Sequence, residues 1–290
     1  MPGQETPAHA GAMRLQVRGL TVRFGGLAAL TDVDLDVADG QVVGLIGPNG
    51  AGKTTVFNAV CGLVRPTAGT VTVAGRPAPR TPSGLAPAGV ARTLQGLGLF
   101  PGLTVLENVE VGALATRGGA HAHGPDGPAR APRSGAARTA DPGDARTADQ
   151  RDARTPDRRD DTAGRALRAL ADLDLADRAA LPVGALPYPE QKRVALARAL
   201  VAEPRLLLLD EPAGGLGAAD IAELDATVRR VAATGCAVLL VEHHVDFVME
   251  LCDRVVVLDF GRVIADGRPD AVRRDPAVTA AYLGIEVTAR

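Results

Sequence analysis

The stretch VVGLIGPNGAGKTT at residues 42–55 decides the fold of this chain. Its first five residues are almost continuously apolar, which is typical of a strand covered on both faces of a sheet. A glycine-rich turn follows, and then a helical pattern that we expect to run from Lys53 to about Val64, before Arg65-Pro66. A buried strand that leads through such a turn into a helix predicts an α/β fold.

The rest of the chain repeats this alternation of strands and helices. Short apolar runs at 206–209, 237–241 and 255–258 predict further buried strands. Helical patterns at 189–202 and 218–233 lie between or before them. Residues 13–24 and 33–37 instead alternate apolar and polar side chains, which predicts antiparallel strands with one wet face. We therefore expect a mostly parallel core sheet with an antiparallel β subdomain.

Length and composition are those of an ordinary globular protein. The chain has 290 residues, of which 46% are hydrophobic, so most of it can bury a core. Its 32 Lys and Arg balance 34 Asp and Glu, which argues against a nucleic-acid partner held by bulk positive charge. Cys61, Cys236 and Cys252 lie on apolar patterns without metal-binding spacing. We expect them to be core residues in a reducing compartment.

A middle segment, residues 117–163, contains no Val, Ile, Leu, Met or aromatic residue. It interleaves Arg, Asp and Ala, with the near-repeats DARTADQ and DARTPDR. With no apolar side chain to bury, such a segment cannot offset the entropy of ordering, so we expect a disordered insertion. We interpret His121 and His123 within it as incidental rather than as metal ligands. Short tails are expected at 1–12 and 287–290.

The glycine-rich turn satisfies the pattern GxxxxGK[ST], which predicts a phosphate-binding loop. Glycines let the backbone wrap closely, so that successive N–H groups and the start of the following helix face phosphate oxygens. We expect Lys53 to reach the β- and γ-phosphates and the Thr54 hydroxyl to bind Mg²⁺. The residues expected to bind nucleotide are Gly47, Pro48, Asn49, Gly50, Ala51, Gly52, Lys53, Thr54 and Thr55.

A second element is the apolar strand that ends in Asp210-Glu211. The carboxyl end of this strand should lie beside the phosphate loop, where Asp210 can hold Mg²⁺ through water. Glu211 is then placed to polarise an attacking water, a general-base role that contributes roughly 10²- to 10⁴-fold to a rate. Together the two elements predict an ATPase that uses ATP and Mg²⁺.

Outside the insertion, residues 14–116 and 164–286 resemble the ATP-binding subunit of an ABC transporter. The likeness is carried by GPNGAGKTTVFN at 47–58, ARTLQ at 91–95, DEPAGGL at 210–216 and VEHHVDFVMELCDRVVVLDFGRVIADG at 241–267. The branch that the chain resembles most is the branched-chain amino-acid uptake group. The resemblance implies a P-loop ABC ATPase fold with an antiparallel β subdomain and a helical arm. It divides the ATPase domain into residues 13–116 and 164–286.

The resemblance also implies roles for residues outside the phosphate loop. Phe24 stands where the family stacks an aromatic ring on adenine, although a core Phe at a strand end is the alternative. Gln95 matches the loop glutamine that approaches Mg²⁺ and the attacking water. His243 matches the switch histidine that contacts the γ-phosphate. Its neighbour His244 stands where the family usually has Asp, and we expect it to be exposed and to have no role in hydrolysis, an exposed bystander.

The expected catalytic residues are thus Glu211, His243 and Gln95. The expected metal site consists of Thr54, Gln95 and Asp210.

The chain departs from the family in its signature motif. The family's LSGGQ corresponds here to Leu186-Pro187-Tyr188-Pro189-Glu190. Pro187 replaces a hydroxyl, and Pro189 replaces a glycine whose N–H faces the γ-phosphate across a dimer interface. Proline has no N–H but is tolerated in the first turn of a helix, so we expect an intact fold with a weakened anion site. A divergent but working signature is the alternative.

From these observations we expect the ATP-hydrolysing subunit of a transporter that takes up branched-chain amino acids or a similar small solute. The alternatives are an ATPase of a lipid or lipopolysaccharide exporter, or a catalytically weak subunit that needs a heterodimer partner. The expected partners are integral-membrane permease subunits and a second ATPase subunit, with no nucleic acid. No window approaches the roughly 18 consecutive apolar residues of a membrane span. We therefore expect a peripheral protein at the cytoplasmic face of the plasma membrane.

Overall fold

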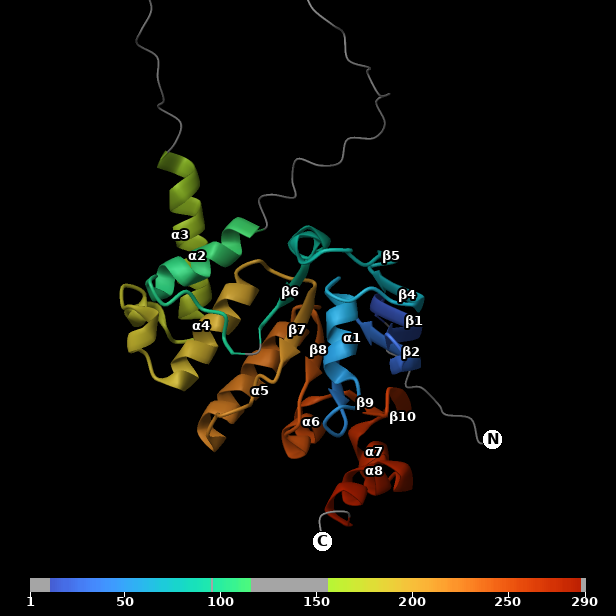
Figure 1. Ribbon diagram of the computed structural model, residues 1–290. Helices are drawn as coiled ribbons and strands as arrows, with labels where there is room; N and C mark the ends of the chain where they lie inside the picture. Colours follow the sequence, from blue (N-terminus) through green and yellow to red (C-terminus); the bar gives the residue numbers. More distant parts are fainter. Residues whose placement is uncertain (1–10, 95, 116–155, 288–290) are drawn as a thin grey trace, which may run out of the picture.

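The computed structural model describes residues 11–94, 96–115 and 156–287. Most of the predicted N-terminal tail, the loop residue Gln95, the two insertion histidines and most of the predicted insertion lie outside these residues. Figure 1 shows a core of strands with a helical part on one side, which consists of α2, α3 and α4. The C-terminal helices α7 and α8 lie at the opposite end.

The core is a six-stranded sheet in the order β10-β9-β3-β8-β7-β6. Five strands, β6, β7, β8, β3 and β9, run parallel to one another, whereas β10 pairs with β9 in the antiparallel sense. Their bounds are Val42–Ile46 (β3), Val90–Arg92 (β6), Leu206–Asp210 (β7), Ala237–Val241 (β8), Arg254–Asp259 (β9) and Arg262–Gly267 (β10). The predicted mostly parallel sheet is confirmed, and the buried strands lie within a residue of their predicted bounds.

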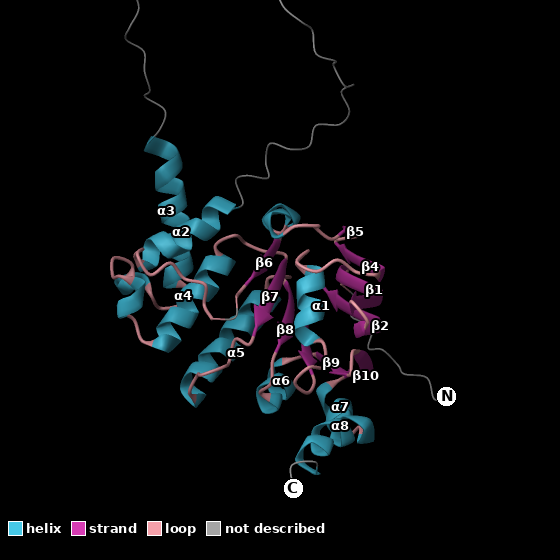
Figure 2. Cartoon of the chain, viewed as in Figure 1, coloured by secondary structure: helices cyan, strands magenta, loops and turns pink. Residues whose placement is uncertain are grey.

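The second sheet is antiparallel and has the order β2-β1-β4-β5. Its strands are Met13–Phe24 (β1), Leu27–Ala38 (β2), Ala68–Val73 (β4) and Arg76–Pro77 (β5). In β1, Leu15, Val17, Leu20 and Val22 are fully buried, which matches the predicted alternation. Figure 2 shows this sheet beside α1, at the side of the core away from the helical part.

The alternating side chains of β3 divide the core into two layers. Val43 and Leu45 pack with β1, β2 and α1, whereas Val42 and Ile46 pack with the helices on the other face. These helices are α4 (Tyr188–Leu200), α5 (Ala218–Ala233) and α6 (Val245–Leu251). Both faces of the sheet are therefore covered, as the continuous apolar strands predict.

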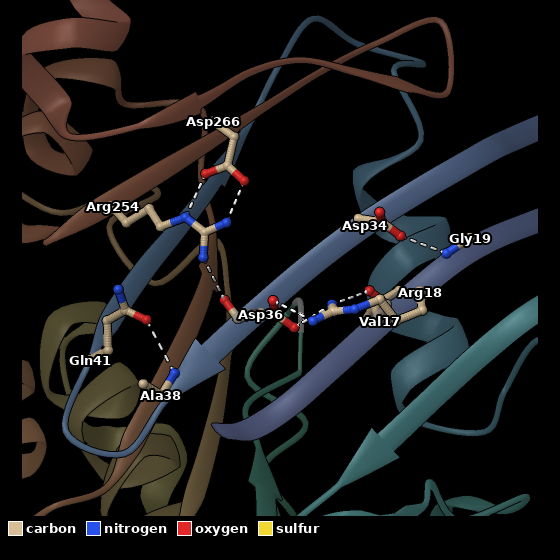
Figure 3. Close-up of polar contacts among 9 residues, drawn as sticks. All are labelled: Val17, Arg18, Gly19, Asp34, Asp36, Ala38, Gln41, Arg254 and Asp266. Carbon is tan, nitrogen blue, oxygen red and sulfur yellow. Dashed lines mark hydrogen bonds and ion pairs between the residues drawn. The ribbon is translucent and has the colours of Figure 1, made fainter. Parts of the chain in front are cut away.

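A polar cluster joins the two sheets where β2 approaches β9 (Figure 3). The Arg254 guanidinium donates to both carboxylate oxygens of Asp266 and to the backbone oxygen of Asp36 at 3.3 Å. On the other side, the Asp36 carboxylate accepts two hydrogen bonds from Arg18. Because Arg254 is itself buried, this cluster ties the antiparallel sheet to the core through satisfied charges.

Helix α1 spans Lys53–Val60 and ends before the predicted Val64. The reason is Gly62, which adopts φ +69° and packs so closely that an added Cβ would lie 2.4 Å from the Pro79 carbonyl oxygen. The backbone N–H groups of Leu63 and Val64 both donate to the Asn58 oxygen instead of continuing the helix. Gly62 therefore acts as a left-handed helix terminator.

The helical arm consists of α2 (Val105–Ala115), α3 (Pro156–Ala171) and α4. Because α3 begins at Pro156, the predicted boundary of the insertion at residue 163 is wrong, and residues 156–163 belong to the arm. Proline is a favourable first residue of a helix, and the buried Thr162, Ala166 and Leu170 follow on one side. A polar composition therefore did not prevent this segment from joining a packed helix.

The remaining elements are short or C-terminal. They are α7 (Pro269–Arg273), α8 (Pro276–Val287) and the 3-10 turns Pro82–Gly84, Ala86–Ala88, Ala176–Arg178 and Val183–Ala185. Cys61, Cys236 and Cys252 are free and buried, which confirms them as core residues. None of the helices that the structure describes is long and apolar enough to cross a membrane.

Candidate nucleotide-binding and hydrolysis site

The phosphate loop connects β3 to α1, and close backbone packing on both sides fixes its path. Gly47 has φ +149°, and a Cβ there would lie 2.1 Å from the Leu258 carbonyl oxygen. Gly52, with φ +105°, directly precedes α1, and a Cβ there would lie 2.9 Å from the Ala29 oxygen. Only glycine fits at these two positions. The free N–H groups of the first turn of α1 lie directly after this loop.

Lys53, the first residue of α1, folds back over the loop. Its ammonium donates to the carbonyl oxygens of Gly47 at 2.6 Å and Pro48 at 2.9 Å. Burial lowers the pKa of Lys53, and the nearby Glu211 carboxylate raises it in part. The lysine is thus positioned by the loop it follows and lies in the field of a carboxylate from β7.

Asp210 is the last residue of β7 and its carboxylate is almost entirely buried. Its Oδ2 accepts a hydrogen bond from Arg92 Nη2 at 2.9 Å, and both side chains are largely shielded from water, 12% and 5% exposed for Arg92 and Asp210. Arg92 comes from the neighbouring strand β6 and its guanidinium also stacks 5.4 Å from the Phe57 ring centroid. The carboxylate is therefore held at the carboxyl edge of the sheet by a compensating charge.

Glu211 leaves the sheet directly after Asp210 in a constrained backbone conformation, with φ +48°. Its N–H donates to the Val241 oxygen at 2.9 Å, and its carbonyl oxygen accepts a hydrogen bond from Lys192 at 3.0 Å. Left-handed φ at a non-glycine residue costs roughly 1–3 kcal/mol and persists only when the surroundings enforce it. Here the backbone contacts from β8 and α4 fix the position from which the carboxylate projects.

His243 follows β8 and brings an imidazole to the same edge. Its Nδ1 lies 4.0 Å from Glu211 Oε1 and 3.8 Å from Glu242 Oε2. The Glu242 carboxylate is fully buried and accepts hydrogen bonds from the N–H groups of Ala213 at 2.6 Å and His243 at 3.0 Å. It therefore ties the segment after β7 to the segment after β8.

Phe24 lies at the end of β1, where it pairs with Leu27 across the hairpin. Its side chain is 53% exposed, so the alternative of a core phenylalanine is wrong. Strand β2 of the hairpin flanks the phosphate loop, because Ala29 and Leu30 both closely approach Gly52. Phe24 thus presents an exposed aromatic ring on the hairpin whose second strand flanks the loop.

The signature segment begins α4, with Pro187 at the N-cap and Pro189 in the first turn. The helix forms as predicted, and its first acidic residue, Glu190, lies 3.6 Å from Arg178. The Tyr188 ring lies against Gly215, where an added Cβ would be 3.0 Å from the ring. A cavity of about 420 Å³ extends from this segment to Asp210 and Glu211. The signature segment and the two carboxylates thus line one cavity.

Three residues that support this edge were not singled out from the sequence. Arg92 neutralises Asp210, Glu242 anchors the segment after β8, and Lys192 holds the backbone of Glu211. Each is charged and lies within or shortly after a recognised motif, which is the signal that could have pointed to it. Their partners lie far away in the chain, so that the pairing itself required the fold. The predicted Gln95 lies outside the described residues.

Comparisons with known proteins agree with this geometry. A family model described as "ABC transporter" matches residues 30–214, and one described as "Branched-chain amino acid ATP-binding cassette transporter" matches residues 262–288. The chain belongs to the ABC transporter family. It is an ABC ATPase, a nucleotide-binding enzyme that hydrolyses ATP, and the expectation formed from its motifs is confirmed.

Two relatives match this ABC ATPase over almost its whole length. The high-affinity branched-chain amino acid transport ATP-binding protein BraF of Pseudomonas aeruginosa is 36% identical over 272 residues, 93% of this chain and 97% of the relative. The corresponding protein LivG of Escherichia coli K12 is 35% identical with the same coverage. The relatives thus match both the first and the last third of the chain.

Solved structures show the same fold. The ADP conformation of an ATP-binding cassette of an ABC transporter superposes with a TM-score of 0.73 at 24% identity, covering 94% of this chain and 99% of that one. A dimeric bacterial ABC transporter cassette superposes with a TM-score of 0.67 at 23% identity, covering 88% and 98%. The predicted P-loop ABC ATPase architecture is confirmed.

Proposed function

We propose that this ABC ATPase energises the uptake of branched-chain amino acids or a similar small solute. The observation that carries the proposal is the likeness to branched-chain amino acid transport proteins at 35–36% identity over 93% of the chain. The match of residues 262–288 to a model specific for such transporters supports it. Residues 262–287 of this match form β10, α7 and α8, which lie outside the general ABC transporter match at 30–214.

The nucleotide in this proposal is MgATP, held by residues 47–55. The residues present fit it: the two close-packed glycines leave the loop backbone free of side chains, and Lys53 supplies a positive charge. Thr54 and Asp210 offer hydroxyl and carboxylate oxygens, which are the ligands that Mg²⁺ prefers. Phe24 offers an exposed ring for the adenine. Bound Mg²⁺ would supply charge stabilisation at the phosphates.

Hydrolysis in this proposal depends on three residues of the chain. Glu211 accepts a proton from the attacking water, and His243, 4.0 Å away, contacts the γ-phosphate. Gln95 completes the set as the residue that orients water and Mg²⁺. Support for the first two is their convergence from β7 and β8 at one edge of the sheet, close to Lys53. Gln95 is carried by the ARTLQ motif alone.

The partners in this proposal are two integral-membrane permease subunits and a second ATPase subunit. The chain would lie at the cytoplasmic face of the plasma membrane, held there by the permease. The relatives are ATP-binding proteins of transport systems, which supports this arrangement.

We propose further that the second ATPase subunit is a different protein. Two of the first positions of α4, Pro187 and Pro189, have no N–H to offer a phosphate, and Glu190 adds a carboxylate. This chain's phosphate loop would then face a complete signature on the partner. Its own signature would complete the opposite site only weakly.

The experiment is transport by the assembled complex. The chain is purified with the membrane subunits that accompany it in native membranes and is reconstituted in proteoliposomes. We expect ATP-dependent accumulation of radiolabelled leucine, isoleucine or valine that is lost in Lys53→Ala. ATP-dependent movement of lipid or lipopolysaccharide without amino-acid uptake would overturn the uptake proposal and support an exporter instead.

A further inference from the structure

Two adjacent histidines at the end of β8 form a feature that the proposed function uses only in part. Neighbouring residues of an extended chain point to opposite sides, yet the ring centroids of His243 and His244 lie 4.5 Å apart, with planes tilted by 36°. The reason is that the chain turns into α6 at His244, which has φ −79° and ψ +87°. Both imidazoles are exposed and lie together.

A third ligand atom lies beside this pair of rings. Glu242 Oε2 is 3.8 Å from His243 Nδ1, and one ligand atom from each of Glu242, His243 and His244 lies within 4.8 Å of the others. The carboxylate is fixed by backbone N–H groups of Ala213, His243 and His244. A carboxylate that is already oriented needs little reorganisation to act as a ligand.

The two histidines of this group are accessible and lie in an acidic surrounding, whereas the Glu242 side chain is fully buried. Both histidines line a groove of about 680 Å³ between α5 and α6. The groove is also lined by Asp225, Asp246 and Glu250, of which Asp225 pairs with Arg229 and Asp246 lies 3.8 Å from Arg273. The excess of carboxylates favours the entry of a cation.

We propose that Glu242, His243 and His244 form a binding site for Zn²⁺. Two imidazoles and one carboxylate are a typical zinc donor set, whereas Mg²⁺ and Ca²⁺ prefer oxygen ligands. Tetrahedral zinc with bonds of about 2.0–2.2 Å brings its ligand atoms to roughly 3.3–3.5 Å from one another. The exposed rings can close the present gaps of 3.8 to 4.8 Å by side-chain rotation. His244 has no part in the proposed hydrolysis, and here it would be a zinc ligand.

Zinc at this site would inhibit ATP hydrolysis. It would hold the His243 imidazole that the proposed function assigns to the γ-phosphate, next to Glu211. Zinc and the catalytic geometry therefore exclude each other, and binding of one opposes the other by linkage. This consequence rests on the proposed function, whereas zinc binding itself does not.

The binding test uses the tag-free, nucleotide-free full chain and Zn²⁺ alone in titration calorimetry. The chain has five histidines, so the reference is the variant His9→Gln/His121→Gln/His123→Gln. We expect it to bind one zinc ion per chain, and we expect addition of His244→Ala to weaken binding at least about tenfold. The buried thiols do not compete, since burial raises the pKa of Cys236 to about 11.

His244 is exposed, so that His244→Ala should keep the melting temperature and ATP binding of the reference variant. Equal zinc affinity with and without His244 would overturn the proposed site. In the assembled transporter with Mg²⁺ in large excess, we expect zinc to inhibit turnover of the reference variant and to spare the His244→Ala form. Inhibition of both forms alike would overturn the inhibitory role. Failure of amino-acid transport would leave the binding result standing.

Discussion

Helices α1 and α4 of this ABC ATPase both begin in a motif assigned to nucleotide binding, yet their first turns offer a phosphate opposite chemistry. Helix α1 follows Gly52 and begins with Lys53, so its first turn offers free N–H groups and a positive charge. Helix α4 begins with Pro187 at its N-cap and Pro189 in its first turn, followed by Glu190. The second start lacks two N–H groups and carries a negative charge.

This difference shows that a helix start and an anion site are separate properties. Proline and an acidic residue in the first turn both favour the helix itself, through fixed φ and interaction with the helix dipole. The same residues remove the N–H groups that a phosphate would use. A sequence can therefore keep the fold of a signature while weakening its ligand site.

The largest effect is expected from Glu211→Gln in the assembled transporter. If only the site at this chain's phosphate loop hydrolyses ATP, turnover should fall by about 10²- to 10⁴-fold while ATP binding is retained. Steady-state phosphate release measures it, with the exposed Glu203→Gln as the matched control. Retention of about half the activity would show that both sites hydrolyse ATP. The difference between the two helix starts would then have no effect on hydrolysis.

Arg92→Gln tests what holds the phosphate-loop side together. It would leave the Asp210 carboxylate buried without its compensating charge, at a cost of about 3 kcal/mol in the free energy of unfolding. Chemical denaturation measures this, with the exposed Arg205→Gln as control. Asp210→Asn in the same chain should restore part of the loss through coupling of the pair. A change in the free energy of unfolding below about 0.5 kcal/mol would show that this ion pair does not stabilise the fold.

The smallest of these effects is expected at Phe24. Replacement by Leu removes the aromatic face but keeps apolar contact, so ATP binding should weaken by about 5- to 20-fold, the lower part of the roughly 1–3 kcal/mol that stacking on a base contributes. Phe24→Tyr keeps the face and should bind as the wild type does. Fluorescent-nucleotide titration measures both. If Leu and Tyr behave alike, the phosphate-loop side recognises adenine elsewhere.

The sequence correctly predicted the parts of the molecule whose structure depends only on residues close together in the chain. The apolar run 42–46, the glycine turn and the helix after Lys53 form one local unit, and the structure has them nearly as predicted. The exposure of Phe24 and the early end of α1 depend on the second sheet and on Pro79. A single local window does not contain these neighbours.

The candidate site divides in the same way. Sequence motifs alone identify residues 47–55, Asp210, Glu211 and His243. The pairing of Arg92 with Asp210, in contrast, joins residues 118 positions apart and could be seen only in the fold. The approach of His244 to Glu242 and His243 depends on the backbone turn into α6, so the sequence suggested only a bystander there. Helix α3 likewise joins the arm through residues whose composition predicted disorder.

The central proposal is that this chain's phosphate loop supports ATP hydrolysis, whereas its own signature does so only weakly. Its most direct test is steady-state ATPase activity of the isolated chain with Mg²⁺, beside Pro187→Ser/Pro189→Gly and the same double variant with Glu211→Gln. We predict little turnover of the wild type, an increase of about tenfold or more in the double variant, and loss of that increase with Glu211→Gln. Full turnover of the wild type with no gain in the double variant would contradict the claim.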